Sequence, residues 1–251
     1  MGKIVTIHSF RGGTGKTNIS ANIAGLLAKI GLKVGIVDTD IQSPGIHVLF
    51  GLDEGSIDKT LNDFVWGNCK IEDAAHDVTA ELGGDAEGKL YLVPSSIKAS
   101  DVAKILREGY NHAKLGDGLK ALDAALGLDV IVVDTHPGCN DVTLLTMALA
   151  DVLGLILRPD QQDYQGTGVT MRIARSLEVP SVKIIVNKSP ALFNPEMVKD
   201  KVTQAYDSDV VAVIPHSDQL MALASAGVYA VKYPDDALTT QFKQITKALL
   251  Q

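Results

Sequence analysis

Cysteine, excess positive charge and long apolar runs are all scarce or absent in this sequence. Its 251 residues include only two cysteines, Cys69 and Cys139, with no CxxC pair, which favours a reducing cytoplasmic setting over a disulfide framework. The net charge of −7 gives no support for nonspecific binding to DNA or to a membrane surface. No apolar run approaches the roughly 18 residues that cross a bilayer, and the apolar, strand-like start leaves no room for a signal peptide. We therefore expect a cytoplasmic protein, with a peripheral position on the nucleoid or a membrane left open.

Short apolar segments of strand length alternate with helical patterns along the chain. Most of these segments lack polar alternation, as expected of strands buried on both faces of a mainly parallel sheet. The expected strands are Lys3–His8, Lys33–Val37, Leu90–Val93, Val130–Val133, Val152–Leu157, Val182–Val186 and Val210–Ile214. The expected helices are Thr17–Lys29, Val102–Leu126, Asp141–Ala150, Gly166–Leu177, Pro195–Ala205 and Ala237–Leu250. This alternation predicts an α/β fold, a doubly wound sheet with helices on both faces and ligands at its carboxyl edge.

We expect a single domain over residues 1–251, because the chain shows no Pro/Ser-rich linker, internal repeat or low-complexity tract. The stretch Gly51–Lys89 differs from the rest, because it is rich in Asp, Gly and Asn and carries the only tryptophan, Trp66. We predict a surface insertion here, with a short helix near Ile57–Val65 and a turn at Gly83-Gly84-Asp85.

A glycine-rich loop, Arg11-Gly12-Gly13-Thr14-Gly15-Lys16-Thr17, lies between the first strand and the first helix. Its three glycines allow backbone angles that other residues resist and let the chain approach a polyphosphate closely. Successive N–H groups and the positive end of the helix then form an anion site. Lys16 supplies a charge for the outer phosphates, and the Thr17 hydroxyl is placed to ligate Mg²⁺. The order of strand, glycine loop, Lys-Thr pair and helix predicts a P-loop for ATP and Mg²⁺. The expected nucleotide contacts are Gly12, Gly13, Thr14, Gly15, Lys16, Thr17 and Asn18.

Carboxylates at the ends of two further strands would complete such a site. Asp38 and Asp40 follow a buried strand and share one face of an extended chain, because they are two residues apart. Beside a triphosphate, one carboxylate would hold the metal and its waters while the other orients an attacking water. Asp134 ends the apolar strand Val130–Val133, as in the Walker B arrangement, and is expected to face Mg²⁺. The plainer alternative for Asp38 and Asp40 is that they cap a turn at the strand end.

The loop departs from the strict pattern GxxxxGK[ST], because Phe10 stands where the first glycine would be. The sequence GGxGK[ST] in its place resembles the deviant Walker A loop of the MinD/ParA ATPases. The resemblance continues through the switch I segment Asp38–Gly45 and the switch II sequence Asp134-Thr135-His136-Pro137-Gly138. It implies a P-loop NTPase fold of the SIMIBI kind, a role in hydrolysis for Asp40, and a Gly138 amide that senses the γ-phosphate.

Arg11 is the main departure from this family, where a signature lysine occupies the same position. That lysine reaches across an ATP-sandwiched dimer to the partner's phosphates, so the resemblance implies a homodimer in the ATP state. Arginine keeps the charge and offers a planar fork suited to phosphate, which would make Arg11 a catalytic residue acting in trans. The alternative is that Arg11 pairs with a carboxylate of its own subunit.

Other positions carry weaker signals. Asn187 and Pro215 match family positions that contact the adenine base, although an asparagine at a strand end can simply form a turn. The polar segment Arg158–Gly168 follows a buried strand, and it either faces the nucleotide or a dimer partner or caps the next helix. His136 suggests a general base, but without an identifiable partner we interpret it as a polar turn residue.

Features of other branches of the family are missing or ambiguous in this chain. Iron–sulfur carrier ATPases use a CxxC pair, and a bridging cluster needs four thiolates, so we predict no iron–sulfur cluster. MinD proteins end in a basic amphipathic membrane helix. Here the apolar stripe is interpreted instead as part of a closing helix packed on the sheet, its members being Leu238, Phe242, Ile245 and Leu249. Lysines suited to nonspecific DNA binding, as in ParA, are scattered and are interpreted as a solvated face.

These features predict a slow, dimeric ATPase that acts as a switch in positioning or partitioning an intracellular cargo. Lys16 would stabilise charge on the phosphates, hydrolysis would release the switch segments, and an unidentified partner protein would stimulate turnover. Two alternatives remain open. One is a nucleotide-sensing binding module with little turnover. The other is an ATP-dependent biosynthetic ligase on the related fold, with Arg158–Gly168 as its second substrate pocket.

Overall fold

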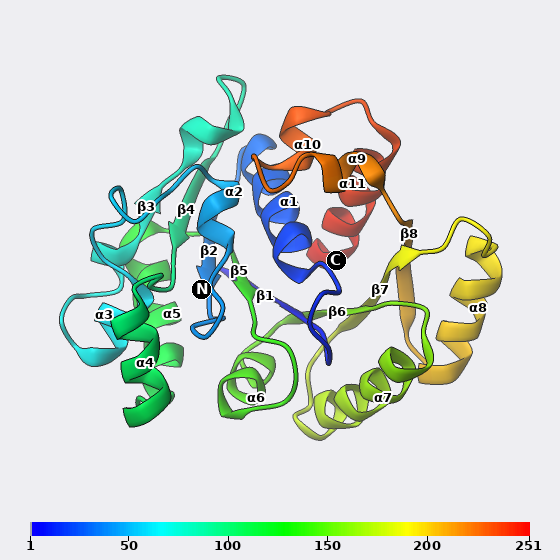
Figure 1. Cartoon of the computed structure of the whole chain (residues 1–251), viewed down its shortest axis with the longest axis horizontal. Coiled ribbons are helices and arrows are strands. Elements are labelled where there is room, and N and C mark those ends of the chain that lie inside the picture. Colours follow the sequence, from blue (N-terminus) through cyan, green and yellow to red (C-terminus); the bar gives the residue numbers. More distant parts are fainter. Residues whose placement is uncertain (1) are drawn as a thin grey trace.

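Eight strands form the centre of the computed structural model, which describes residues 2–251 (Figure 1). They are β1 (Lys3–His8), β2 (Lys33–Asp38), β3 (His76–Asp77), β4 (Lys89–Val93), β5 (Val130–Asp134), β6 (Val152–Leu157), β7 (Val182–Ser189) and β8 (Asp209–Pro215). Their order across the sheet is β3-β4-β2-β5-β1-β6-β7-β8, and neighbours are parallel except for β3 and β4. The predicted doubly wound, mainly parallel α/β sheet is therefore confirmed.

Helices cover both faces of this sheet (Figure 1). One face carries α1 (Lys16–Lys29), α2 (Ile46–Leu49), α9 (Asp218–Ala222), α10 (Tyr229–Lys232) and α11 (Ala237–Leu250). The other carries α3 (Leu61–Trp66), α4 (Ala99–Glu108), α5 (Ala113–Leu126), α6 (Asp141–Ala148), α7 (Gln161–Ser176) and α8 (Pro195–Tyr206). Strand residues alternate between the two cores: in β5, Val132 packs under α1 while Val133 packs under α5. Such strands lack polar alternation because both of their faces are buried.

The apolar stripe of α11 belongs to the core. Leu238, Phe242, Ile245 and Leu249 are all buried against α1 and the sheet. This confirms the interpretation of α11 as a closing helix. Among residues 2–251, no helix combines the length and the apolar character that a bilayer crossing requires.

The expected helix Val102–Leu126 is wrong as a single element. The chain forms α4 and α5 instead, because Gly109 adopts a left-handed φ of 64° and its N–H bonds back to the Ile105 carbonyl at 2.8 Å. The expected helix Gly166–Leu177 begins earlier, at Gln161. Asp160 caps it by accepting from the backbone N–H groups of Gln162 and Asp163.

The stretch Gly51–Lys89 is not confined to the surface. It contributes β3, which pairs with β4 at the edge of the sheet, and α3, which starts at Leu61 after a capping box between Thr60 and Asp63. The side chains of Leu61, Val65 and Ile71 are buried in the core beneath α5. Although it is rich in Asp and Gly, the stretch thus supplies several anchors to this core, the second core, which lies between α5 and the sheet.

Candidate functional site

The glycine loop lies at the carboxyl edge of the sheet, between β1 and α1. Gly13 and Gly15 have φ values of 76° and 96°, a region that favours glycine. A Cβ on Gly15 would also stand 2.5 Å from the Nδ2 atom of Asn187. The expectation that Gly12 needs the same freedom is wrong, because its φ is not positive and a Cβ there would meet only Pro137, at 3.8 Å.

The first turn of α1 is open to an anion. Its N-cap is Gly15, which has no side chain to accept from the N–H groups of that turn. These groups border a cavity of about 440 Å³ whose walls include Lys16, Thr17, Asp40 and His136. A helix N-terminus with unpaired N–H groups attracts phosphate, so the cavity has the electrostatics of a phosphate site.

Lys16 is held beneath this cavity by a residue that sequence reasoning did not identify. Its ammonium group donates to the Ser9 hydroxyl at 3.1 Å, and the Thr14 hydroxyl donates to the same oxygen at 2.9 Å. Ser9 in turn donates to the Arg11 carbonyl at 2.7 Å. Burial lowers the pKa of Lys16, although the carboxylates of Asp134 and Asp40 oppose that shift. Ser9 therefore fixes the lysine and the loop backbone together.

Asp38 and Asp134 lie side by side, as register partners at the ends of β2 and β5. Both are buried, and burial raises the pKa of Asp134 to about 6 and that of Asp38 well above its ordinary value. Asp134 accepts from the Ser20 hydroxyl at 2.8 Å. Asp38 accepts from the backbone N–H groups of Asp40 at 3.0 Å and Gly45 at 3.3 Å, so it also holds the switch I segment, as the turn-capping alternative requires.

These oxygens suit a hard cation. Among residues 2–251, no three His, Cys, Asp or Glu side chains cluster as a metal site on their own. The hydroxyl of Thr17 and the carboxylates of Asp38 and Asp134 are oxygen donors, and Mg²⁺ is typically held by one or two carboxylates together with substrate phosphates. Burial disfavours the ionised forms of these two adjacent carboxyl groups, and a bound divalent cation would offset that cost by stabilising them as carboxylates. The donor set therefore fits a Mg²⁺ ion that arrives with a nucleotide.

Asp40 and His136 face the cavity from the two switch segments, Asp38–Gly45 and Asp134–Asn140. Burial raises the pKa of Asp40, while the nearby His136 and Lys16 lower it. The Nδ1 atom of His136 is buried without a hydrogen-bond partner. His136 and Asp40 thus line the same cavity from the ends of neighbouring strands, a proximity that the sequence context of His136 did not reveal.

The Gly138 amide is already engaged in this structure. It donates to the Ser9 carbonyl at 3.1 Å, and Gly138 has a left-handed φ of 84°. The expectation that this amide senses a γ-phosphate therefore requires it to leave Ser9. The contact joins the switch II segment to the base of the glycine loop.

A second cavity, of about 190 Å³, adjoins the loop and contains Asn18, Asn187 and Pro215 in its walls. The Nδ2 atom of Asn187 donates to the Thr14 carbonyl at 2.7 Å, which leaves its Oδ1 atom as an acceptor. Lys188, which sequence reasoning did not identify, donates to the Gly13 carbonyl at 2.8 Å. The structure thus brings Asn187 and Pro215, the two residues expected around the base, together with the loop residue Asn18, next to the phosphate cavity.

Arg11 pairs with carboxylates of its own subunit. Its guanidinium lies 3.7 Å from Asp160 and 3.6 Å from Asp163. Arg158 shares both carboxylates, at 3.4 and 3.0 Å. The alternative of pairing within the subunit is therefore what this structure contains. The segment Arg158–Gly168 forms the cap and the first turns of α7, as its helix-capping alternative requires.

Phe10, which replaces the first glycine of the strict P-loop pattern, packs on α7. A Cβ on Gly166 would clash with the Phe10 side chain, so the absence of a side chain at 166 makes room for the ring. The departure from the strict pattern is thus compensated by a glycine on a helix more than 150 residues away in sequence. No sequence signal links the two positions.

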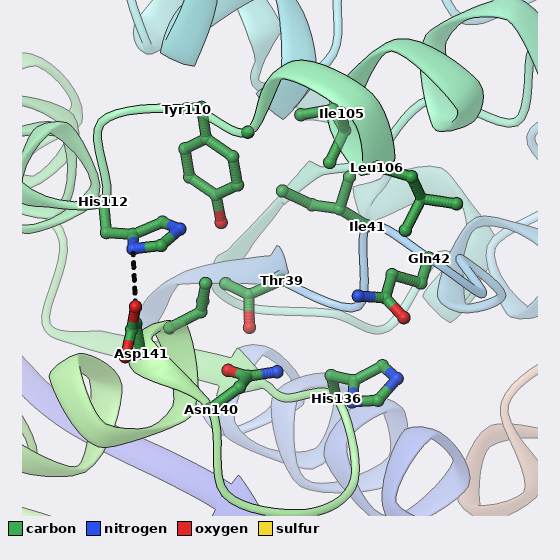
Figure 2. Close-up of a pocket in the computed structure, with 12 residues that line it drawn as sticks. Thr39, Ile41, Gln42, Ile105, Leu106, Tyr110, His112, His136, Asn140 and Asp141 are labelled. Carbon is green, nitrogen blue, oxygen red and sulfur yellow. Dashed lines mark ion pairs between the residues drawn. The ribbon is translucent and has the colours of Figure 1, made fainter.

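A third cavity, of about 230 Å³, lies between the switch segments and the turn that joins α4 to α5 (Figure 2). Thr39 and Gln42 line it from switch I, and His136 and Asn140 line it from switch II. The Tyr110 hydroxyl points into it (Figure 2), and burial raises the pKa of Tyr110 to about 12, so this group stays a donor at neutral pH. Because His136 borders both this cavity and the phosphate cavity, the two spaces share a wall.

His8, at the end of β1, should make the protein sensitive to acid. It is buried against Thr135, with Nδ1 2.8 Å from the hydroxyl oxygen, and burial followed by the charges of Lys16 and His136 lowers its pKa from 6.5 to about 3. Below pH 6.5 His8 binds a proton in the unfolded chain but stays neutral in the folded chain. The neutral, buried His8 therefore contributes fully to stability above pH 6.5, and this contribution is lost as the pH falls toward 3. At pH 5 the loss is about 2 kcal/mol.

Lowering the pH from 7.5 to 5.0 should reduce the unfolding free energy of both the parent chain and the His8→Gln variant. We expect the reduction in the variant to be smaller by about 2 kcal/mol. Urea denaturation at the two pH values measures this difference. His216→Gln, at an exposed histidine that pairs only with the exposed Asp218 at 3.3 Å, is the control and should change the pH dependence much less. An unchanged pH dependence in His8→Gln would show that His8 titrates normally.

Comparison with known proteins places this geometry in a family. The family model for the AAA domain matches residues 2–184. The chain is 27% identical over 247 residues to an uncharacterized ATP-binding protein of Methanocaldococcus jannaschii, covering 98% of this chain and 87% of the relative. It is 24% identical over 267 residues to the septum site-determining protein MinD of Thermotoga maritima (99% and 88% covered). An iron–sulfur cluster carrier protein of Pyrococcus furiosus is 24% identical over 264 residues (98% and 85%).

Solved structures give the same result for the fold. MinD of Pyrococcus horikoshii, solved in complex with Mg-ADP, has a TM-score of 0.80 at 24% identity and covers 99% of this chain and 96% of its own. A ParA family ATPase from Chlorobium tepidum has a TM-score of 0.77 at 19% identity, with 100% of both chains covered. The chain therefore belongs to the AAA domain family and has the fold of the MinD and ParA ATPases.

Proposed function

We propose that this protein binds ATP with Mg²⁺ and hydrolyses it slowly, as a cytoplasmic dimeric switch of the MinD/ParA type that positions or partitions a cargo. The observation that carries the proposal is the phosphate cavity, which has Lys16, Thr17 and Asp40 in its walls above the buried carboxylate of Asp134. The relatives named as ATP-binding protein and as MinD support the same nucleotide. The Mg-ADP in the related MinD structure supports the metal.

Each residue would have a distinct role in hydrolysis. Lys16 would hold the outer phosphates, and Thr17, Asp38 and Asp134 would hold the metal, whose charge offsets that of the triphosphate. Asp40 would orient the attacking water, since it is the carboxylate that faces the cavity. The switch segments would move when the γ-phosphate pulls the Gly138 amide away from Ser9.

The base would occupy the cavity beside Asn18, Asn187 and Pro215. The Oδ1 atom of Asn187 is positioned as an acceptor because its Nδ2 atom is tied to the Thr14 carbonyl. An adenine amino group is a donor, so this acceptor would favour adenine over a base that presents a carbonyl at the same position.

We infer that Arg11 acts across the dimer after leaving Asp160 and Asp163. Its side chain is 39% exposed, and both ion pairs are longer than 3.5 Å. The phosphates bound by a partner subunit would therefore compete well with these carboxylates for the Arg11 guanidinium. In trans it would act as an arginine finger, and dimerisation would gate hydrolysis. In the subunit alone it would remain with α7.

Arg11→Ala should lower turnover at least about 100-fold while the Kd for ATP changes less than about threefold. Phosphate release by the parent chain should rise more steeply than linearly with protein concentration. Arg107→Ala, at the end of α4, is the control and should retain parental turnover. Equal losses in turnover and binding would count against a role in trans.

Mixing two inactive variants tests the same point directly. In a mixed dimer of Arg11→Ala and Asp40→Ala chains, one site combines an intact Asp40 with the partner's intact Arg11. A 1:1 mixture should therefore recover about a quarter of the parental turnover, because half the dimers are mixed and each has one complete site. No recovery, with dimers present, would place the action of Arg11 within its own subunit.

We do not assign an iron–sulfur cluster to this chain, although one of its relatives is a cluster carrier protein. Cys69 is half-buried beside the second core, while Cys139 is exposed at the start of α6. Burial raises the pKa of both thiols, so neither is primed as a thiolate ligand at neutral pH.

The cavity between the switch segments supports a second candidate, an ATP-dependent ligase. Such an enzyme needs a polar substrate pocket beside the phosphates, and the space lined by Gln42, Tyr110 and His136 meets that need (Figure 2). Arg158–Gly168, nominated from the sequence, is a poorer choice because Arg158 is engaged with Asp160 and Asp163. Phosphate release that depends on a small metabolite, rather than on protein concentration, would favour this candidate.

A further inference from the structure

An apolar groove lies between the C-terminal ends of α1 and α11, away from the nucleotide cavities. It has a volume of about 540 Å³, and its lining includes Leu26, Ile30, Ala230, Pro234 and Leu250. Because α1 begins at the phosphate loop and rises 1.5 Å per residue, about 20 Å separate the groove from that loop. The groove is therefore a separate feature of the surface.

The apolar walls of this groove are open to solvent. Ile30, at the end of α1, is 64% exposed, whereas Leu26 and Ala230 form a buried floor. An exposed apolar concavity of this size is typical of a site that binds an apolar group. The stripe of α11 that points at the sheet is not available for such binding, because it is already packed in the core.

The charged residues at the rim of the groove indicate the sign of the charge that its ligand would carry. Lys29, Lys243 and Lys247 line it together with a single acid, Asp85, which pairs with Lys29 at 2.9 Å. The lining thus has a net charge of +2 in a chain whose total is −7. Lysine stems can lie along apolar surface while their charged ends stay exposed, and the Lys243 ammonium group also donates to the Pro234 carbonyl at 3.2 Å. This rim would therefore meet an anion at the mouth of the groove.

We propose that the groove binds the alkyl chain of a monomeric anionic amphiphile, the simplest being a medium-chain fatty acid. The chain would lie on Leu26 and Ala230 beside Ile30, and the carboxylate would meet Lys243 and Lys247. A concave groove between two packed helices suits one chain at a time. A bilayer surface would instead call for a protruding apolar face. This site is independent of the proposed ATPase function.

Calorimetric titration with octanoate, decanoate and laurate, each below its critical micelle concentration, tests the proposal without any nucleotide. Each added methylene should tighten binding about fourfold until the groove is filled. Laurate should bind at least about tenfold more tightly than 1-dodecanol, which has the same chain without the charge. The Lys16→Ala chain should give the same constants, which separates this result from the fate of the ATPase proposal.

The Lys243→Ala/Lys247→Ala chain should weaken laurate binding at least about tenfold and leave 1-dodecanol binding unchanged. Lys199→Ala/Lys201→Ala, two exposed lysines of α8 on the opposite face, is the matched control and should bind laurate normally. All four side chains are exposed, so the variants should fold, which circular dichroism verifies. Equal losses in both double variants, affinity independent of chain length, or binding only to phosphatidylglycerol vesicles would overturn the proposal.

Discussion

Asp40→Ala should release phosphate at least about 100-fold more slowly than the parent chain at saturating ATP, the range expected when a positioned base is removed. The Kd for ATP should change less than about threefold, because removing a carboxylate from the phosphate cavity takes away repulsion rather than a contact. Single-turnover phosphate release measures the first quantity, and titration with a fluorescent ATP analogue measures the second.

Asp40→Asn separates chemistry from loop structure. The Oδ1 atom of Asp40 accepts from the Ser43 N–H at 3.0 Å, and asparagine retains an oxygen acceptor for that contact. We expect this variant to hydrolyse ATP as poorly as Asp40→Ala while the switch I turn stays intact. If Asp40→Asn kept parental turnover, Asp40 would act through the loop and not through its charge.

Lys16→Ala should weaken ATP binding about 100-fold or more and abolish turnover. The ammonium group is buried beneath the cavity, so its contact with phosphate would be poorly screened by water. Its removal also leaves the carboxylates of Asp40 and Asp134 without their nearby cation, which raises the repulsion toward a triphosphate. Fluorescent nucleotide titration and steady-state phosphate release test both effects.

Lys188→Ala is the matched control for Lys16. Lys188 lines the same cavity, but it is exposed and its ammonium group is 2.8 Å from the Gly13 carbonyl. Because water screens an exposed charge, its loss should weaken ATP binding less than about tenfold. Equal losses from the two substitutions would mean that net charge, and not the buried position of Lys16, governs binding.

The secondary structure of a segment could be predicted wherever its pattern of buried residues is compatible with only one element, either a strand or a helix. β1, β6 and α11 have the bounds expected from their apolar patterns, because the two strands are buried over all or nearly all of their length and the helix is buried along one stripe. The break at Gly109 could not be predicted, since a glycine inside a helical pattern is compatible with either outcome. The burial of Ile71 could not be predicted either, because this residue packs in the second core although it lies in a polar stretch of the sequence.

The site could be predicted where strand ends carry its residues. Asp38 and Asp134 meet because parallel strands end at one edge of the sheet, and Asn187 reaches the loop for the same reason. Ser9 and Lys188 were missed, because their roles depend on side-chain contacts with the loop that no spacing encodes. The pairing of Arg11 depends likewise on the cap of α7.

The packing of Phe10 on Gly166 has a consequence for how this protein's relatives can vary. The ring occupies the space of a side chain at 166, so the two positions cannot be enlarged independently. Among close relatives, residue 166 should remain glycine wherever position 10 carries an aromatic ring. Where position 10 carries a small residue, a larger residue should be tolerated at position 166. Covariation between these two positions would thus mark the subgroup in which α7 and the nucleotide loop have evolved as one unit.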